Sequence, residues 1–98
     1  MLTEDYEKKF LNWMYKNTKL SKYSQGRYIG AINKISYKVL EINPEYSSIE
    51  ELIKSNQAEK LINLFFALPE IRSFNDKGNR MYSSAFKKIL QFQNDQIK

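Results

Sequence analysis

The sequence predicts an all-α protein, a compact bundle of four to five helices. Apolar residues recur at intervals of three or four through most of the chain, which is the period of an amphipathic helix. Hydroxyl side chains precede several of these segments as helix caps, and no segment has the pattern of a strand. The 98 residues suffice for one small core. We therefore expect one helical domain over 1–98, with a frayed tail from about 94 to 98.

The first two helices have clear start signals and clear apolar faces. Thr3 is expected to cap a helix that ends near Asn17. Ser21 is expected to cap a second helix that runs to about Glu41, before Asn43-Pro44 breaks the chain. The predicted buried faces are Tyr6, Phe10, Trp13 and Met14 on the first helix, and Tyr28, Ile32, Ile35 and Val39 on the second.

Three shorter helices are expected in the remaining chain. Ser47 or Ser48, followed three residues later by Glu50 or Glu51, is a capping-box signature for a short third helix. Ser55 is expected to cap a fourth helix, with the long loop 69–78 after it and a fifth helix from near Asn79. The predicted buried faces are Ala58, Leu61, Ile62 and Phe65 on the fourth helix, and Tyr82, Ala85, Phe86, Ile89 and Phe92 on the fifth.

The composition argues against several classes of protein. The chain has no cysteine and no histidine, so it lacks thiolate chemistry, disulfides and the usual general base. It also has no phosphate-binding glycine loop, no acidic cluster with metal-ligand spacing and no nucleophile elbow. We therefore expect a protein that is not an enzyme and needs no metal or cofactor. Because no apolar run approaches about 20 residues and no signal peptide is evident, we expect a cytoplasmic protein with no membrane partner.

Charge is distributed unevenly along the chain, which has a net charge of +5. Residues 8–40 contain eight bases and no acid, residues 41–70 contain six acids and two bases, and residues 71–98 contain six bases and two acids. Folding such a chain would give a surface with separate positive and negative regions, which is typical of nucleic-acid-binding proteins.

The second helix carries a further stripe opposite its apolar face, made of Tyr23, Arg27, Gly30, Lys34 and Tyr37. The cations could be ordinary solvated charges or contacts to phosphate. The tyrosines could cover a loop, stack on bases or sugars, or belong to a protein interface. Gly30 costs about 1 kcal/mol relative to alanine inside a helix, which either close packing or close approach of a phosphate backbone would explain.

The start of the predicted fifth helix is also basic, with Lys77, Gly78, Asn79 and Arg80 in succession. Its backbone N–H groups could hold a phosphate, or the segment could be a simple glycine turn with an asparagine cap. The residue pattern of this helix, Tyr82-x-x-Ala85-Phe86-x-Lys88-Ile89, is similar to the pattern Tyr28-x-x-Ala31-Ile32-x-Lys34-Ile35 in the second helix.

Two further aromatic residues are candidates for partner contact. Phe66 lies beside the apolar stripe of its helix and could be an exposed anchor. Tyr46, in the NPEYSS segment, could contact a partner or fold back on the core. Trp13 and Phe65 are expected in the core.

Two segments resemble a known family. The run LSKYSQGRYIGAINKISYKVL, residues 20–40, resembles the first long helix and its lead-in in the SAM-like core-binding domain of tyrosine recombinases, the phage integrases. The run NDKGNRMYSSAFKKILQF, residues 75–92, resembles the last helix of that domain, and both are similar to small helical modules of restriction-type proteins. The resemblance implies a SAM-like bundle that lies against duplex DNA. The family's catalytic domain has no counterpart here, so strand cleavage is not implied.

The sequence thus leads to a non-enzymatic module that contacts duplex DNA mainly through its phosphate backbone, as a targeting domain of a nuclease, restriction or recombination system. The alternative is a protein-binding adaptor or a small phage-type inhibitor that docks through Tyr23, Tyr37 and Phe66, and the exposed aromatic face is also compatible with a homodimer. Carried over by position, the resemblance implies DNA contacts by Lys22, Tyr23, Arg27 and Lys34 in the first run and by Arg80, Lys87 and Lys88 in the last. The predicted DNA-binding residues also include Lys19, Tyr37, Lys38 and Lys77.

Overall fold

The structure, a computed structural model, describes residues 1–97, which form six α-helices and contain no strand. The predicted all-α class is therefore confirmed. The helices are α1 (Glu4–Asn17), α2 (Lys22–Ile42), α3 (Ile49–Lys54), α4 (Ala58–Ala67), α5 (Pro69–Lys77) and α6 (Met81–Gln96).

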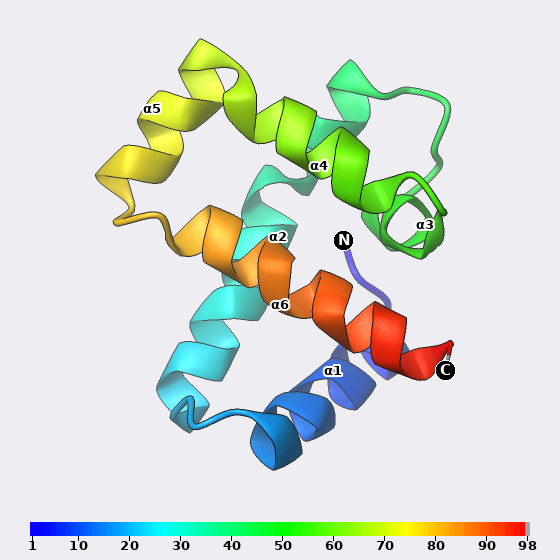
Figure 1. Cartoon of the computed structure of the whole chain (residues 1–98), viewed down its shortest axis with the longest axis vertical. Coiled ribbons are helices and arrows are strands. Elements are labelled where there is room, and N and C mark those ends of the chain that lie inside the picture. The colour runs from blue at the N-terminus through cyan, green and yellow to red at the C-terminus, as the bar shows by residue number, and fades with distance from the viewer. Residues whose placement is uncertain (98) are drawn as a thin grey trace.

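Helix α6 is the centre of the bundle. It crosses in front of α2 in Figure 1, with α1 on one side and α4 and α5 on the other. It contacts each of the other five helices among the described residues. The shared core is therefore organised around the apolar face of α6, whose predicted residues Tyr82, Ala85, Phe86, Ile89 and Phe92 are all buried.

The other predicted core faces are largely confirmed. Phe10, Met14, Ile32 and Phe65 are almost fully buried within one cluster of apolar side chains. Trp13 and Tyr28 are half-buried and pack against this cluster, and Leu61 is half-buried. Phe10, Trp13 and Phe92 lie with ring centroids 5.4 to 6.4 Å apart, so α1 and the end of α6 share an aromatic contact.

Three predicted helix caps are also confirmed. The side-chain oxygens of Thr3, Ser21 and Ser48 accept hydrogen bonds from backbone N–H groups three residues later, at 3.1 to 3.3 Å. Such a bond satisfies one of the N–H groups that a helix start leaves unpaired. Of the two serines considered, Ser48 is the cap. The N–H and the hydroxyl of Ser47, the residue before it, both donate to the carboxylate of Glu51.

The expected long loop 69–78 is wrong, because this segment forms α5. Pro69 ends α4 and also occupies the first turn of α5, where the missing N–H of proline is not needed. Ile71 and Asn75, one turn apart, are buried on the inner face of this helix. The centroid of the Phe74 ring lies 4.8 Å from that of the Tyr82 ring of α6. These tertiary contacts stabilise a segment of low local helix signal.

The expected cap at Ser55 is also wrong. The N–H of Ser55 donates to the carbonyl of Leu52, so this residue ends α3 rather than starting α4. Helix α4 begins after Gln57, which makes no side-chain cap hydrogen bond. The Ser55 hydroxyl is buried without a hydrogen-bond partner among residues 1–97.

Helix α6 differs from expectation at both ends. It begins at Met81 rather than near Asn79, because Asn79 and Arg80 adopt left-handed backbone conformations with φ of 56° and 61°. The tail that was expected to fray from about residue 94 is helical through Gln96, so that expectation is wrong for residues 94–96. Lys98 lies outside the described residues.

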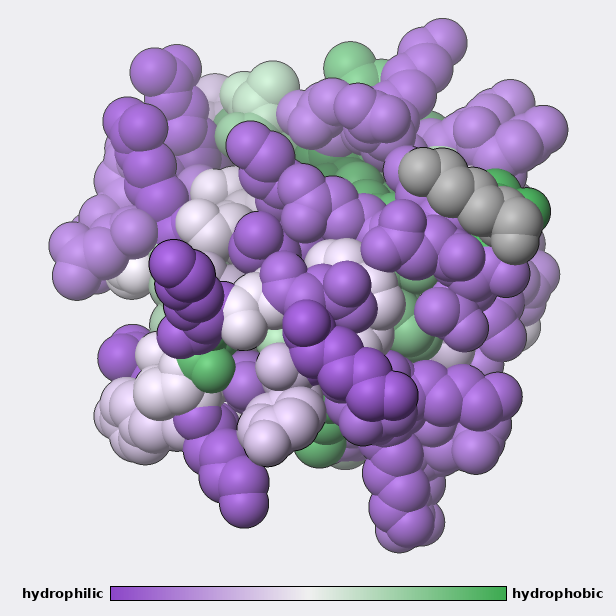
Figure 2. All heavy atoms as spheres, turned by 60° about the horizontal axis from the view of Figure 1, so that its bottom comes forward, coloured by the Kyte–Doolittle hydropathy of each residue, from purple (hydrophilic) through white to green (hydrophobic). Residues whose placement is uncertain are grey.

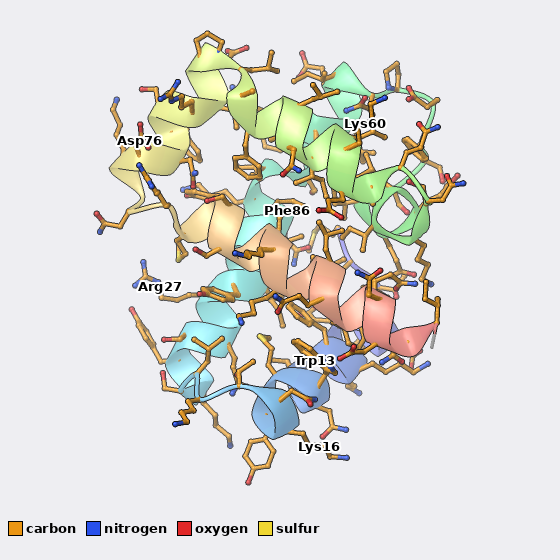
Figure 3. All side chains as sticks on the ribbon, in the orientation of Figure 1. Trp13, Lys16, Arg27, Lys60, Asp76 and Phe86 are labelled. Atoms are coloured by element: carbon orange, nitrogen blue, oxygen red, sulfur yellow. The ribbon has the colours of Figure 1, made fainter. Side chains whose placement is uncertain are left out.

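Side chains of α1 hold this end of α6 in place. The Tyr6 hydroxyl donates to Gln93 at 2.7 Å, and the Trp13 indole N–H donates to Asp95 at 2.7 Å. Trp13 lies between the two helices in Figure 3.

Candidate functional site

The stripe of Tyr23, Arg27, Gly30, Lys34 and Tyr37, hereafter the outer face of α2, is exposed along its whole length. This agrees with the prediction that it points into solvent. Tyr23 and Tyr37 retain 74% and 64% of their exposure, so neither ring covers a loop. Two reasons remain for placing tyrosines here, stacking on a nucleic acid and contact with a protein.

Cations on this face lie close to aromatic rings. The Arg27 guanidinium lies 5.6 Å from the centroid of the Tyr23 ring, one turn away on α2. The Lys34 ammonium lies 5.4 Å from the centroid of the Phe74 ring on α5. Cation–π attraction is worth about 0.5–1 kcal/mol at exposed sites, so these contacts orient the charges without neutralising them.

Gly26 and Gly30 leave the backbone of α2 uncovered over one helical turn. A Cβ atom built on either glycine would meet no atom within 4 Å, and both residues are exposed. Packing against α1 or against the tail, one reason considered for Gly30, is therefore wrong. Each glycine costs about 1 kcal/mol of helix stability relative to alanine, and no contact within the described fold requires it.

The two basic segments of the sequence meet at the N-terminal half of α2. A hollow of about 190 Å³ separates α2 from the turn between α5 and α6. Its lining includes Ser24 and Arg27 from α2, and Gly78 and Asn79 from the turn. Arg27 extends from α2 on the side of this turn in Figure 3. Residues separated by about half the chain thus contribute to one surface.

The backbone amides at the start of α6 are already used within the protein. The N–H of Arg80 donates to the carbonyl of Asn75 at 2.8 Å, and the N–H of Met81 donates to Gly78 at 3.1 Å. The N–H of Ser83 donates to the Asn75 side chain at 3.1 Å, so Asn75 rather than Asn79 caps the helix. The N–H groups of Arg80, Met81 and Ser83 are therefore not free to hold a phosphate, and the side chains of the turn remain available.

Most of the predicted cations have no acidic partner. Four ion pairs occur among residues 1–97, and each joins residues four apart on or beside one helix: Lys8–Glu4, Lys9–Asp5, Lys54–Glu50 and Arg80–Asp76. Of the predicted site residues, only Arg80 is included, at a loose 3.8 Å. Lys19, Lys22, Arg27, Lys34, Lys77 and Lys87 are exposed, and Lys38 and Lys88 are half-buried.

On the face drawn in Figure 2, charged and polar side chains predominate, and hydrophobic atoms appear in small separate patches. None of the helices in residues 1–97 is long and apolar enough to cross a membrane. Within the same residues, no group of three or more acidic side chains is placed to hold a metal ion.

Arg80 and Lys87 face a second depression. They line a groove of about 540 Å³ between α4 and α6, which shares no lining residue with the hollow at Arg27. Arg80 and Lys87 therefore line a different depression from Arg27. Asn63, Gln91 and Asn94, which were not singled out from the sequence, also line this groove. The available signal was that Asn63 lies three residues before Phe66, on the same side of α4.

Phe66 and Tyr46 are not exposed anchors. The Phe66 ring lies 5.5 Å from Phe65 and 5.7 Å from Phe86 of α6, so the residue is half-buried against the core. Phe66 is therefore only partly exposed, and its role in docking stays a prediction. Tyr46 is half-buried and packs on the core, as the second of its two alternatives predicted.

The perturbed titratable groups lie away from the outer face of α2, near the N-terminus. Burial raises the pKa of the Tyr6 hydroxyl far above its usual range, and the carboxylate of Glu50 adds to this effect. Burial also raises the pKa of Glu50, but hydrogen bonds from the Thr3 hydroxyl and N–H, together with the Lys54 ammonium, outweigh it and hold the pKa below its ordinary value. This cluster joins the N-terminus to α3.

A scan against protein-family models found no matching family, and searches of curated proteins and of solved structures found no similar protein. The functional argument therefore depends on the geometry and charge described above.

Proposed function

We propose that this protein is a non-enzymatic DNA-binding module that contacts duplex DNA through the phosphate backbone, using the outer face of α2 and the turn between α5 and α6. The observation that carries the proposal is a set of exposed cations on this surface that form no ion pair with any residue in 1–97, including Lys22, Arg27, Lys34 and Lys77. Phosphates are the usual partners of such cations, and their neutralisation releases counterions.

The two open glycines support this proposal. Gly26 and Gly30 leave α2 without side chains where a groove edge would approach, which lets a sugar–phosphate backbone come close to the helix. Arg27 and Lys34, on the same face, would contact the flanking phosphates, and Tyr23 and Tyr37 would lie against sugars. Such contacts position a protein on DNA and carry little sequence information, so we expect weak sequence preference.

Under the resemblance of residues 20–40 and 75–92 to the core-binding domain of tyrosine recombinases, α2 and α6 would be the helices that lie against DNA, which favours the same surface. In such a setting the module would be the targeting part of a nuclease, restriction or recombination system.

A second candidate function is protein binding through Tyr23 and Tyr37, which the high exposure of both rings favours. Tyrosine is common at protein interfaces because one end of the ring is apolar and the hydroxyl can donate and accept hydrogen bonds. The partner could be another protein or a second copy of this chain.

Salt dependence tests the proposal and separates the two functions. Fluorescence anisotropy with a random-sequence duplex should show binding at low salt that weakens steeply as salt rises. The logarithm of the affinity should fall by about 0.9 for each tenfold rise in salt and each phosphate neutralised. Contacts dominated by aromatic rings would respond much less. Absence of duplex binding at low salt would contradict the DNA proposal.

A further inference from the structure

The groove between α4 and α6 has a composition that differs from the outer face of α2. Its volume of about 540 Å³ lies within the range of about 300–1,000 Å³ typical of small-molecule sites. Apolar side chains in its lining are Ile62, Phe66 and Leu90, and its polar side chains include amides, hydroxyls and two cations. The groove therefore combines a small apolar area with many hydrogen-bonding groups.

The apolar part of the groove is suited to a flat ring. Phe66 is half-buried, and its two aromatic neighbours lie at steep angles to it, 79° for Phe65 and 64° for Phe86. Neither neighbour stacks on the Phe66 ring in parallel. With only three apolar residues in the lining, the groove lacks the row of apolar pockets that an amphipathic helix needs.

The polar part of the groove provides amides and positive charge. Asn63 and Asn94 make no side-chain hydrogen bond with the other residues in 1–97, and both line the groove. Among the lining residues, Arg80 and Lys87 are the cations and Glu59 is the acid, and Arg80 also pairs loosely with Asp76 at 3.8 Å, outside the lining. Asparagine amides pair well with the edges of bases, and arginine and lysine bind phosphate.

From these features we propose that the α4–α6 groove binds one unpaired nucleotide, with its phosphate at Lys87 and Arg80 and its base against Phe66 and Leu90. Asn63 and Asn94 then contact the base edge. Apart from Arg80, which belongs to the turn in the proposed duplex surface, the groove residues lie outside that surface. Variants of Lys87 and Asn63 therefore test the groove independently of the duplex proposal. The nucleotide can come from a single strand or from a free mononucleotide, because both present the same base and phosphate.

The test uses the whole chain and a labelled single strand of about 10 nucleotides, followed by fluorescence anisotropy. We expect Lys87→Gln to weaken strand binding about fivefold or more, and Asn63→Ala to weaken it further in combination. Lys60→Gln is the matched control, because Lys60 is an exposed α4 lysine outside this groove and should leave binding unchanged. All three residues are exposed, so these variants should fold, and far-ultraviolet circular dichroism checks this.

Competition with adenosine monophosphate and with inorganic phosphate identifies the source of the nucleotide. Displacement of the strand by adenosine monophosphate at a concentration well below that of inorganic phosphate supports the site and shows that it accepts free nucleotides. Strand binding that is sensitive to Lys87→Gln and is not displaced by the mononucleotide supports the site with a single strand as its source. Equal displacement by both competitors would overturn the proposal, because the groove would then be a general anion site. Equal losses in Lys60→Gln and Lys87→Gln, or no binding of either nucleic-acid probe, would overturn it too.

Discussion

The N-terminal cluster around Glu50 and the outer face of α2 use charge in opposite ways. Around Glu50 the acid, its cation and its hydrogen-bond donors satisfy one another, and the Lys54 ammonium also lies 5.0 Å from the centroid of the Tyr6 ring. On α2, Arg27 and Lys34 lie beside aromatic rings and form no ion pair with any residue in 1–97. Charges of the first kind stabilise the fold, and those of the second kind are left exposed to solvent, where we propose that DNA phosphates bind.

The largest effect is expected on stability, from removing the carboxylate at the centre of the Glu50 cluster. Glu50→Ala removes the acceptor of two hydrogen bonds from Thr3 and the partner of Lys54, so it should destabilise the protein by about 2 kcal/mol. For a chain of this size each kcal/mol lowers Tm by about 4–8 °C. Thermal unfolding measures the change. Glu41→Ala is the control, since Glu41 is exposed and makes no ion pair among residues 1–97. A similar loss in both variants would contradict the distinction between the regions.

The next effect concerns the second region and function rather than stability. Replacing Arg27 and Lys34 together with glutamine should weaken duplex DNA binding by at least about tenfold and reduce the salt slope by about 2. The Tm should fall only slightly, because both side chains are exposed. Anisotropy titrations at several salt concentrations measure both quantities.

The matched control for this pair is Lys8→Gln with Lys9→Gln. These two lysines have the same charge but pair with Glu4 and Asp5 at 3.8 and 3.2 Å, so their loss should leave DNA binding nearly unchanged. Equal losses in the two double variants would show that only net charge matters, and the comparison between paired and unpaired cations would fail.

Substituting Gly30 sharpens the comparison, because stability and function should change in opposite directions. Gly30→Ala should stabilise the protein by up to about 1 kcal/mol, since the new methyl group meets no atom within 4 Å. The same methyl group would keep a phosphate backbone away from α2 and weaken duplex binding. Chemical denaturation and anisotropy measure the two effects. A more stable variant with unchanged affinity would mean that DNA does not approach the helix at this turn.

The smallest effect is a pH dependence of stability that comes from the first region. The pKa of Glu50 is lower in the folded protein than its ordinary value of 4.5, so the folded state favours the ionised carboxylate. Its stabilising contribution is complete above pH 4.5 and is lost as the pH falls below that value through the folded pKa. Urea unfolding across this range should show a steeper loss for the native sequence than for Glu50→Ala. Parallel curves would contradict this assignment.

Local signals predicted those parts of the fold that local forces determine. The caps at Thr3 and Ser21 and the buried face of α6 follow from side chains within a few residues of one another. Helix α5 was missed because Pro69 was interpreted as a stop only, although it is also compatible with a helix start. Its stability depends on contacts such as Phe74 with Tyr82, which periodicity alone does not reveal.

The candidate site was predictable only in part for the same reason. The exposure of Tyr23 and Arg27 follows from helix period once the opposite face is known to be apolar. The approach of Arg27 to Gly78 and Asn79, and the separation of Lys87 from that surface, are set by how α2 and α6 cross. No residue pattern within α2 or within α6 predicts how the two helices cross.

The central position of α6 has a consequence for biosynthesis. α1 obtains its aromatic contact with Phe92 and its hydrogen bonds to Gln93 and Asp95 from residues translated more than seventy positions after it begins. While the chain emerges from the ribosome, Phe10 and Trp13 have no native partner in α6 and remain available to chaperones. The bundle is therefore expected to fold only after α6 has left the ribosome, and not helix by helix from α1. Nascent chains arrested before residue 92 should remain sensitive to protease.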